Sequence, residues 1–384
     1  MPEYGFTEDH VFLRQTVQKF VKNEIAPGAK ERASQNRIPD WMIKKVAEQG
    51  YIGMGAQEKY GGQAMDWMSV GIVVEELGKV DLGAAHLVIV PTQLCALLES
   101  GTEEQRQKWL PPLCRGEIMP SVAITEAGAG TDAAAISMKA VREGDGYVLE
   151  GEKAPVSRGM QANLIVVWAK TDPQAGARGV SCFLVPKDTP GLSVTEIDHL
   201  GFHPVRSASL NFESVKVPLT NRVGDEGKGF TMLMDRFDVM KVLISLVAMG
   251  IAETSLNEVM DYVRIRETFG RALGKYEAIS FKIAEAFTMI DACRLLCYRA
   301  IWMRDHGIRH SKESAMVKWY VPKVAFDITH DCILMMGHYG YSTEHAFGQR
   351  MLDVLGYQIG DGTAEAQKLI LVREILGKEF LPYR

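Results

Sequence analysis

The 384-residue chain lacks the features that mark several classes of protein. Its 43 lysines and arginines are outnumbered by 48 acidic residues, so it lacks the positive surface that nucleic-acid binding requires. No uninterrupted apolar run reaches the roughly 18 residues of a membrane-spanning helix, and no secretory signal opens the chain. We therefore expect no nucleic-acid partner, no membrane span, and a location in the bacterial cytoplasm or, for a mature eukaryotic chain, in the mitochondrial matrix.

Cysteine is scarce and has no paired spacing. The six residues are Cys95, Cys114, Cys182, Cys293, Cys297 and Cys332. This usage is typical of free thiols in a reducing compartment. Cys293 and Cys297 share a helix face without a second ligand pair, which favours a core position over a metal site. His306 and His310 have metal-like spacing, but Gly307 interrupts the helix between them, so we expect a surface loop and no metal.

The remaining composition is that of a globular protein, with 47% hydrophobic and 24% charged residues in a chain long enough for two or three domains. The character of the sequence changes twice along the chain. Helical patterns occupy residues 1–118, β-branched and alternating patterns occupy 119–228, and long helical patterns occupy 229–384. We expect an N-terminal α-helical domain, a middle β-domain and a C-terminal α-helical domain with these limits.

Local signals mark several helices and strands within these parts. Thr7 is placed to cap a first helix, and residues 102–105 (Thr-Glu-Glu-Gln) form a capping-box pattern. Residues 162–169 and 180–185 are apolar runs typical of strands, and 208–217 alternates with period two. In the last third, apolar residues line one face of a helical run that could span about 45 Å at 1.5 Å per residue. Its members are Ile279, Ile283, Ala286, Ile290, Cys293, Cys297 and Ile301.

A single carboxylate near the C-terminus, Asp361, stands between Gly360 and Gly362 and precedes a helical run from Ala364 to Gly377. A ligand can approach this carboxylate closely because no neighbouring side chain shields it. That geometry suits a general base, which must come within hydrogen-bond reach of the proton it removes. Taken alone, an acidic residue just before a helix is more often the N-terminal cap of that helix.

Residues 123–133 contain a Gly-x-Gly-x-x-Ala pattern that is similar to a dinucleotide fingerprint. Such a fingerprint requires a helix directly after the glycines, whose N-terminus holds the pyrophosphate. Here a turn and a strand follow at 144–149, so we reject a Rossmann unit. The backbone N–H groups of the glycines could still face an anionic ligand.

A third segment, Arg266-Glu267-Thr268-Phe269-Gly270, places an arginine near a helix end. Arginine is well suited to bind phosphate there. Alternatively, Arg266 is a solvated surface residue where the helix stops.

Six motifs in order along nearly the whole chain resemble those of the acyl-CoA dehydrogenase family. They lie at residues 124–132, 151–159, 201–218, 266–270, 337–344 and 359–367. The resemblance implies a multi-domain α+β fold, with an N-terminal α-helical domain, a middle β-barrel domain and a C-terminal four-helix bundle. It also implies FAD, an acyl-CoA thioester substrate, an electron-transfer flavoprotein as partner, and a homotetramer.

In this family a base removes the α-proton of the thioester while a hydride passes from the β-carbon to flavin N5, and the resemblance places Asp361 at the base. The residues that it places at the cofactor are Val122, Ile124, Thr125, Gly130, Thr131, Pro155, Val156, Ser157, Arg266, Thr268, Phe269, Leu334, Gly337, His338, Thr363 and Glu365. Those that it places at the substrate are Thr131, Asp238, Lys241, Asp361 and Gly362.

The sequence departs from the family pattern around this site. Asp361 and Gly360 replace the usual glutamate and tyrosine, and Pro155 replaces a tryptophan. Lys241 stands where arginine is common, and Met240 occupies the position from which some members supply the base. Further departures are Val122 for an aromatic residue, Leu334 and Glu365 for glutamines, and His338 for glycine.

The loss of large groups at Pro155 and Gly360 suggests a pocket for a branched or cyclic acyl group, such as cyclohexanecarboxyl-CoA, with Val88, Ile89 and Val90 as apolar surface. Two other functions stay open. One is an enoyl-CoA reductase or another non-dehydrogenating relative, and the other is an assembly-only paralogue without flavin.

Overall fold

The N-terminal part is helical in the computed structural model, which describes residues 3–382. Its helices are α1 (Glu8–Phe20), α2 (Ala29–Ala33), α3 (Asp40–Glu48), α4 (Trp67–Gly78), α5 (Leu82–Leu98) and α6 (Glu103–Cys114). Both predicted caps are confirmed. Thr7 accepts the N–H of His10 at the start of α1, and Thr102 accepts that of Gln105 at the start of α6.

The middle part is an eight-stranded sheet. Its strands are β1 (Pro120–Ala123), β2 (Lys139–Glu143), β3 (Gly146–Ser157), β4 (Leu164–Lys170), β5 (Val180–Pro186), β6 (Leu192–Glu196), β7 (Ser207–Pro218) and β8 (Arg222–Val223). The order is β6-β7-β3-β2-β4-β5-β8, with β1 parallel to β4. The predicted strands at 162–169, 180–185 and 208–217 are confirmed as β4, β5 and β7. A short 3-10 turn (Ala133–Ala135) and then β2 follow the glycines, which confirms that no Rossmann helix begins there.

The C-terminal part is again helical. Its elements are α7 (Gly229–Ile265), a hairpin of β9 (Glu267–Thr268) and β10 (Arg271–Ala272), α8 (Glu277–Asp305), α9 (Ser311–Met336), α10 (His338–Tyr341), α11 (Phe347–Ile359) and α12 (Ala364–Leu376). The predicted apolar face of α8 is buried from Ala286 to Ile301, whereas Ile279 and Ile283 are only partly buried. All six cysteines are free and buried, as expected. Within residues 3–382 no group of three or more metal-binding side chains occurs.

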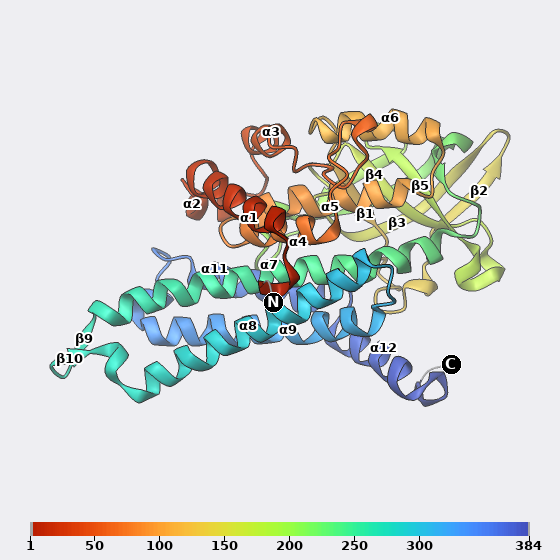
Figure 1. Ribbon diagram of the computed structural model, residues 1–384. Coiled ribbons are helices and arrows are strands. Elements are labelled where there is room, and N and C mark those ends of the chain that lie inside the picture. Colours follow the sequence, from red (N-terminus) through yellow and green to blue (C-terminus); the bar gives the residue numbers. More distant parts are fainter. Residues whose placement is uncertain (1–2, 383–384) are drawn as a thin grey trace.

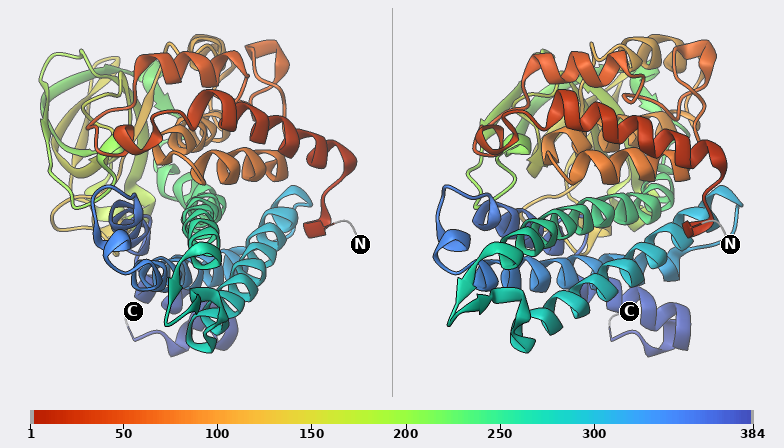
Figure 2. Two further views of the ribbon diagram at one scale, coloured as in Figure 1. Left: turned by 90° about the vertical axis from the view of Figure 1, so that its left-hand side faces the viewer. Right: turned by 60° about the vertical axis from the view of Figure 1, so that its left-hand side comes forward.

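Helix α7 is long and apolar enough, by length and composition, to cross a membrane. However, 89% of its most apolar window is buried inside the protein. Figures 1 and 2 show why: the N-terminal helices and the sheet lie side by side above the C-terminal helices, and α7 runs between the two layers. The hydrophobicity of α7 therefore serves the core, where it contacts α4, α5, α8, α9 and α11.

Candidate active site

Asp361 lies on the short loop between α11 and α12, and its backbone is left-handed with φ 55°. Thr363, and not Asp361, caps α12, because the Thr363 side chain accepts the N–H of Ala366. The sequence analysis left open that Asp361 is the N-terminal cap of this helix, but Thr363 fills that role. As a whole residue, Asp361 is exposed. Glu365 is also exposed, in the first turn of α12, where its only ion pair within residues 3–382 is a loose 3.7 Å contact with Lys368.

The electrostatics of Asp361 are those of a group that is reachable by solvent yet surrounded by protein. Burial in the surrounding structure raises the pKa of its carboxyl above the ordinary value, while the charges of Lys318 and Lys241 lower it. The first effect is the larger. The raised pKa is the direction expected for a carboxylate that accepts a proton near neutral pH.

Lys318 is a site residue that the sequence reasoning missed. It projects from α9, is 1% exposed, and its Nζ donates to the carbonyl oxygens of Tyr357 at 2.8 Å and Gly362 at 2.9 Å. The available signal was a lysine at helical spacing on an otherwise apolar stripe that includes Val321 and Ala325.

Lys241 and Asp238 face each other on α7, with Lys241 Nζ 3.2 Å from Asp238 Oδ1. The second Asp238 oxygen accepts the hydroxyl of Ser311 at the start of α9. Met240 is buried in the main core, 2% exposed, so its side chain packs and does not face the site. The structure thus gathers Lys241 of α7, Lys318 of α9 and Asp361 of the loop after α11 into one electrostatic group.

The predicted cofactor segment at residues 122–131 follows β1 and runs beside β3. The N–H of Ala154 donates to the carbonyl of Thr125 at 2.9 Å, which joins the two segments. A Cβ built on Gly128 or Gly130 would meet no atom within 4 Å, so the backbone is open to a ligand there. Thr131 is exposed beside these glycines. This open, glycine-lined backbone fits an extended anionic cofactor.

Glu126 and Lys153 hold this segment in place. Lys153 is fully buried, and its Nζ donates to Glu126 Oε1 at 2.7 Å and to the Ile124 carbonyl at 2.8 Å. Glu126 also accepts the N–H groups of Ser137 and Met138. Burial lowers the pKa of Lys153 to about 8 although Glu126 acts in the opposite direction. Glu126 therefore has a structural role in the motif, which the sequence did not distinguish from a ligand contact.

The other predicted cofactor residues near this segment differ in exposure. Pro155 and Ser157 are exposed on β3, while Val122 and Ile124 are half-buried. Val156 is fully buried in the core of the sheet, so only its backbone is available to a ligand.

A second group of predicted cofactor residues lies far from the first. Arg266, Thr268 and Phe269 form the hairpin after α7, and Phe269 is 96% exposed. Tyr262 at the end of α7 packs against Tyr339, 6.0 Å between ring centroids, which brings the hairpin near α10 and its neighbours Leu334, Gly337 and His338. Figure 1 shows the hairpin at the opposite end of α7 from the sheet. The 37 residues of α7 extend about 55 Å at 1.5 Å per residue, so a single chain does not bring the two groups together.

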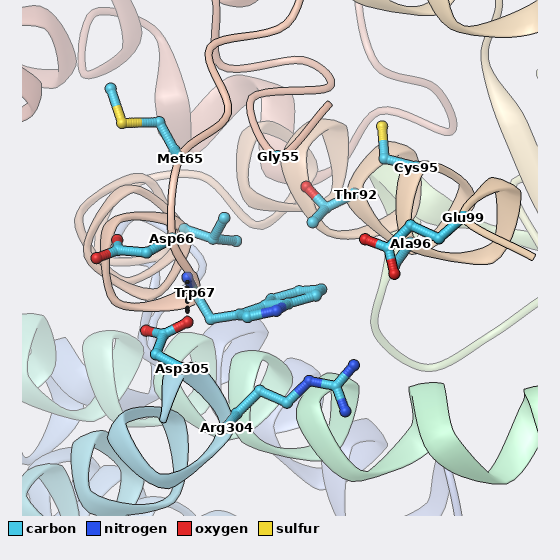
Figure 3. Close-up of a pocket in the computed structure, with 11 residues that line it drawn as sticks. Gly55, Met65, Asp66, Trp67, Thr92, Cys95, Ala96, Glu99, Arg304 and Asp305 are labelled. Carbon is cyan, nitrogen blue, oxygen red and sulfur yellow. Dashed lines mark hydrogen bonds between the residues drawn. The ribbon is translucent and has the colours of Figure 1, made fainter. Parts of the chain in front are cut away.

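A cavity of about 290 Å³ lies elsewhere, between α4, α5 and the end of α8 (Figure 3). Its lining includes Trp67, Thr92, Arg304 and Asp305, and it contains none of the predicted site residues. Asp305 accepts the N–H of Trp67 at 2.9 Å, and Arg304 pairs with Asp235. These charges already have partners within the protein, so we do not assign the reaction to this cavity.

Three family models match the chain: the acyl-CoA dehydrogenase N-terminal domain at residues 7–117, the middle domain at 121–215 and the C-terminal domain at 227–376. A short-chain specific acyl-CoA dehydrogenase of Clostridium acetobutylicum is 35% identical over 97% of this chain and 99% of the relative. A 3-(aryl)acrylate reductase of Clostridium sporogenes is 32% identical over the same shares. The chain belongs to the acyl-CoA dehydrogenase family and is therefore an oxidoreductase.

Solved structures agree with this assignment. Butyryl-CoA dehydrogenase from Megasphaera elsdenii superposes with a TM-score of 0.93 at 32% identity, over 97% of this chain and 99% of its own. A chain in the structure of the electron transferring flavoprotein of Acidaminococcus fermentans gives 0.93 at 35% identity over the same shares. The FAD complex of PigA gives 0.93 at 26% identity, again over 97% and 99%. The predicted succession of helical, β-sheet and helical domains is confirmed.

Proposed function

We propose that this protein dehydrogenates an acyl-CoA thioester to the α,β-enoyl-CoA, with Asp361 as the base that removes the α-proton. The observation that carries the proposal is the state of Asp361. Residue 361 is exposed, the pKa of its carboxyl is raised by burial in the surrounding protein, and Thr363 fills the capping role that would otherwise explain it. A carboxylate left free in this way suits proton abstraction.

The α-proton beside a thioester carbonyl is a poor acid until hydrogen-bond donors stabilise the developing enolate oxygen. The backbone N–H of Asp361 is one such donor, because within residues 3–382 no backbone carbonyl accepts it. The proton passes to the Asp361 carboxylate, on which the charge of Lys241, the partner of Asp238, also acts. FAD, when bound, supplies the acceptor for the hydride that leaves the β-carbon.

FAD is the cofactor, held by the open backbone at Thr125, Gly130 and Thr131 and by the outer face of β3 at Pro155 and Ser157. Arg266, Thr268 and Phe269 serve the cofactor of a neighbouring copy in a homotetramer, because they lie beyond the reach of the first group in their own chain. An electron-transfer flavoprotein receives the electrons. The likeness to a chain in the Acidaminococcus flavoprotein structure supports this partner.

The acyl group is branched or cyclic near its α-carbon, for example a cyclohexanecarboxyl group. A Cβ built on Gly360 would meet only the Gly356 carbonyl oxygen, at 3.6 Å, so the space of a larger side chain is open beside the base. Val88 and Ile89 are packed in the core, whereas Val90 is half-buried, so of the three only Val90 has surface to offer an acyl group.

A second candidate is reduction of an enoyl thioester by the same residues in reverse, with Asp361 donating the proton. The reductase from Clostridium sporogenes, similar over nearly the whole chain, favours this direction. A raised pKa suits a proton donor as well as a proton acceptor.

The first experiment is anaerobic bleaching of the bound flavin by a panel of straight, branched and alicyclic acyl-CoA thioesters. We expect the alicyclic or branched substrates to exceed straight C4–C8 chains by about tenfold in kcat/KM. Rapid reoxidation of reduced flavin by enoyl-CoA, with no bleaching by any acyl-CoA, would instead establish the reductase. Protein purified without flavin would support the assembly-only alternative.

The second experiment replaces Asp361. Asp361→Asn keeps the size and the backbone N–H but cannot accept a proton, so flavin reduction should slow by about 10²-fold or more while FAD stays bound. Asp361→Glu extends the carboxylate and should lower activity on cyclic substrates more than on straight ones. Wild-type flavin reduction by Asp361→Asn would show that this carboxylate is not the base.

A further inference from the structure

Lys318 forms hydrogen bonds to the loop that carries Asp361, one on each side of that residue in the sequence. Its Nζ donates to Tyr357 O, four residues before Asp361, and to Gly362 O, one residue after it. The side chain is 1% exposed, so both bonds lie inside the protein. A lysine buried to this degree normally has a carboxylate partner. The ammonium group of Lys318 instead donates its hydrogen bonds to these two backbone carbonyls.

The two carbonyls are groups that the local secondary structure leaves without partners. Helix α11 ends at Ile359, so the Tyr357 carbonyl belongs to the last turn, whose oxygens lack helical N–H donors. A positive charge at that end is also favourable for the helix dipole. Gly362 lies on the loop itself, and its carbonyl receives a second, longer bond of 3.4 Å from Gln367 Nε2.

The backbone between these two hydrogen bonds has an energetically unfavourable conformation. Asp361 has φ 55° and Gly362 has φ 95°, both in the left-handed region that a residue with a side chain rarely adopts. A side chain one methylene shorter than glutamate depends more strongly on where the backbone places it, because it has one torsion fewer with which to adjust. Because both flanking carbonyls are held, the backbone position from which the Asp361 side chain extends is held as well.

We propose that Lys318 is a positioning residue that holds the Asp361 loop in its left-handed conformation and places a positive charge beside it. The proposal rests on the function proposed above only for the second effect. Other charged or titratable groups also face this place: Lys241 and Asp238 from α7, and Tyr357 from α11. Burial lowers the pKa of Lys318 itself to about 8, while Asp361 acts to raise it and Lys241 to lower it further.

The test compares Lys318→Met, which keeps the length and removes the charge and donors, with Lys323→Met on the same helix. Lys323 is exposed and pairs only with Asp327, at 2.6 Å, among the described residues, so it controls for loss of a lysine from α9. Hydrogen exchange of residues 357–363 reads the loop directly and needs no substrate. We expect about tenfold faster exchange there in Lys318→Met and no change in Lys323→Met.

The second readout is the pH dependence of flavin reduction by the best thioester. Loss of the nearby positive charge raises the pKa of Asp361, so the limb on which activity rises with pH should move up by about 1 pH unit. The maximal rate should also fall, by about tenfold, with FAD content unchanged. A residue that only stabilises the fold would lower the melting temperature and leave this limb in place.

The proposal would be overturned if Lys318→Met exchanged the amide hydrogens of residues 357–363 at the wild-type rate and its activity rose over the same pH range as in the wild type. If that variant does not fold, Lys318→Gln serves in its place, since it is neutral and shorter and should shift the limb in the same direction. If none of the thioesters reduces the flavin of the wild-type protein, the proposed function fails. The exchange experiment then still decides whether Lys318 holds the loop.

Discussion

Gly360 and Gly362 both flank Asp361, but the backbone requires glycine at only one of them. Gly362 has φ 95°, and a Cβ there would lie 2.6 Å from Gln367 Nε2. Gly360 has an ordinary φ of −60°, and a Cβ there would meet nothing closer than 3.6 Å. The glycine at 360 therefore opens space beside the base, while the glycine at 362 permits the turn.

This difference predicts opposite results for two alanine variants. Gly360→Ala should fold normally and lower kcat/KM for a cyclic or branched thioester by about tenfold, because one methyl group in a fitted pocket has an effect of that size. Straight-chain thioesters should be spared. Gly362→Ala should destabilise the protein by about 1–2 kcal/mol through its positive φ, measured by urea denaturation. Equal losses on straight and cyclic substrates in Gly360→Ala would show that residue 360 does not face the acyl group.

At the scale of single residues, some members of the site could be predicted from the sequence and others could not. Asp361 could be singled out because two glycines and a family motif surround it. Lys153 could not, because a lysine in a strand normally points to solvent, and the one signal for Lys318, its place on an apolar stripe of α9, does not identify its partners. Their importance depends on which carbonyls the tertiary structure places beside them, and no local pattern encodes that.

At the scale of elements, a buried charge cluster joins the N-terminal helices to the C-terminal ones. Glu75 on α4 is 0% exposed and accepts Arg294 Nε of α8 at 2.6 Å and Arg14 Nη2 of α1 at 2.8 Å. The hydroxyl of Tyr298 donates to the same carboxylate at 2.6 Å. Burial by itself would raise the pKa of Glu75, but Arg294, Lys79 and Arg14 outweigh it and lower the pKa to about 2.

Glu75→Gln should therefore destabilise the protein by about 3 kcal/mol, because Arg294 and Arg14 lose a fully buried counter-charge and keep only Glu253 and Glu76 as acidic partners. Glu24→Gln is the matched control, since Glu24 pairs with Lys45 in an exposed bridge whose loss should leave the stability nearly unchanged. Urea denaturation at neutral pH measures both.

The pH dependence of this effect follows from the direction of the shift. The pKa of Glu75 is depressed in the folded state below the ordinary value of 4.5, so its contribution is fully present above that pH. The contribution is lost as pH falls from about 4.5 toward 2, and the stability difference between wild type and Glu75→Gln should shrink over that window. A difference independent of pH would mean that the ionised carboxylate is not what stabilises the cluster.

Most elements were predictable because their signals are local. The capping boxes at Thr7 and Thr102, the alternating strand β7 and the apolar face of α8 each depend on neighbours within a few residues. The separation of the hairpin from the sheet was not predictable in this way. It is set by the length of α7 and by the packing of that helix between the two layers.

At the scale of the whole molecule, the two groups of predicted cofactor residues lie at opposite ends of α7 (Figure 1). If Arg266 binds the phosphate of a neighbour's FAD, Arg266→Ala removes a charge-assisted bond of about 1.5–3 kcal/mol. FAD content and the proportion of full oligomer, measured by absorbance and light scattering, should both fall. Arg264→Ala is the control, because Arg264 lies two residues earlier and pairs with Asp261 at 2.9 Å. Full FAD content and unchanged assembly in Arg266→Ala would remove Arg266 from the site.

Mixed oligomers decide whether the site is shared between copies. Gly130→Glu places a negative charge on the open backbone of the first group, where an added Cβ meets no atom within 4 Å, and should abolish FAD binding without disturbing the fold. Neither this variant nor Arg266→Ala has a complete site by itself. In a shared arrangement, however, the first group of an Arg266→Ala chain meets the intact Arg266 of a Gly130→Glu chain. Coexpression at equal levels should then restore FAD to about a quarter of the sites, the proportion expected when two kinds of chain combine at random in a symmetric pair. If each chain bound FAD with its own residues alone, no mixture would contain an intact site, and coexpression would restore nothing.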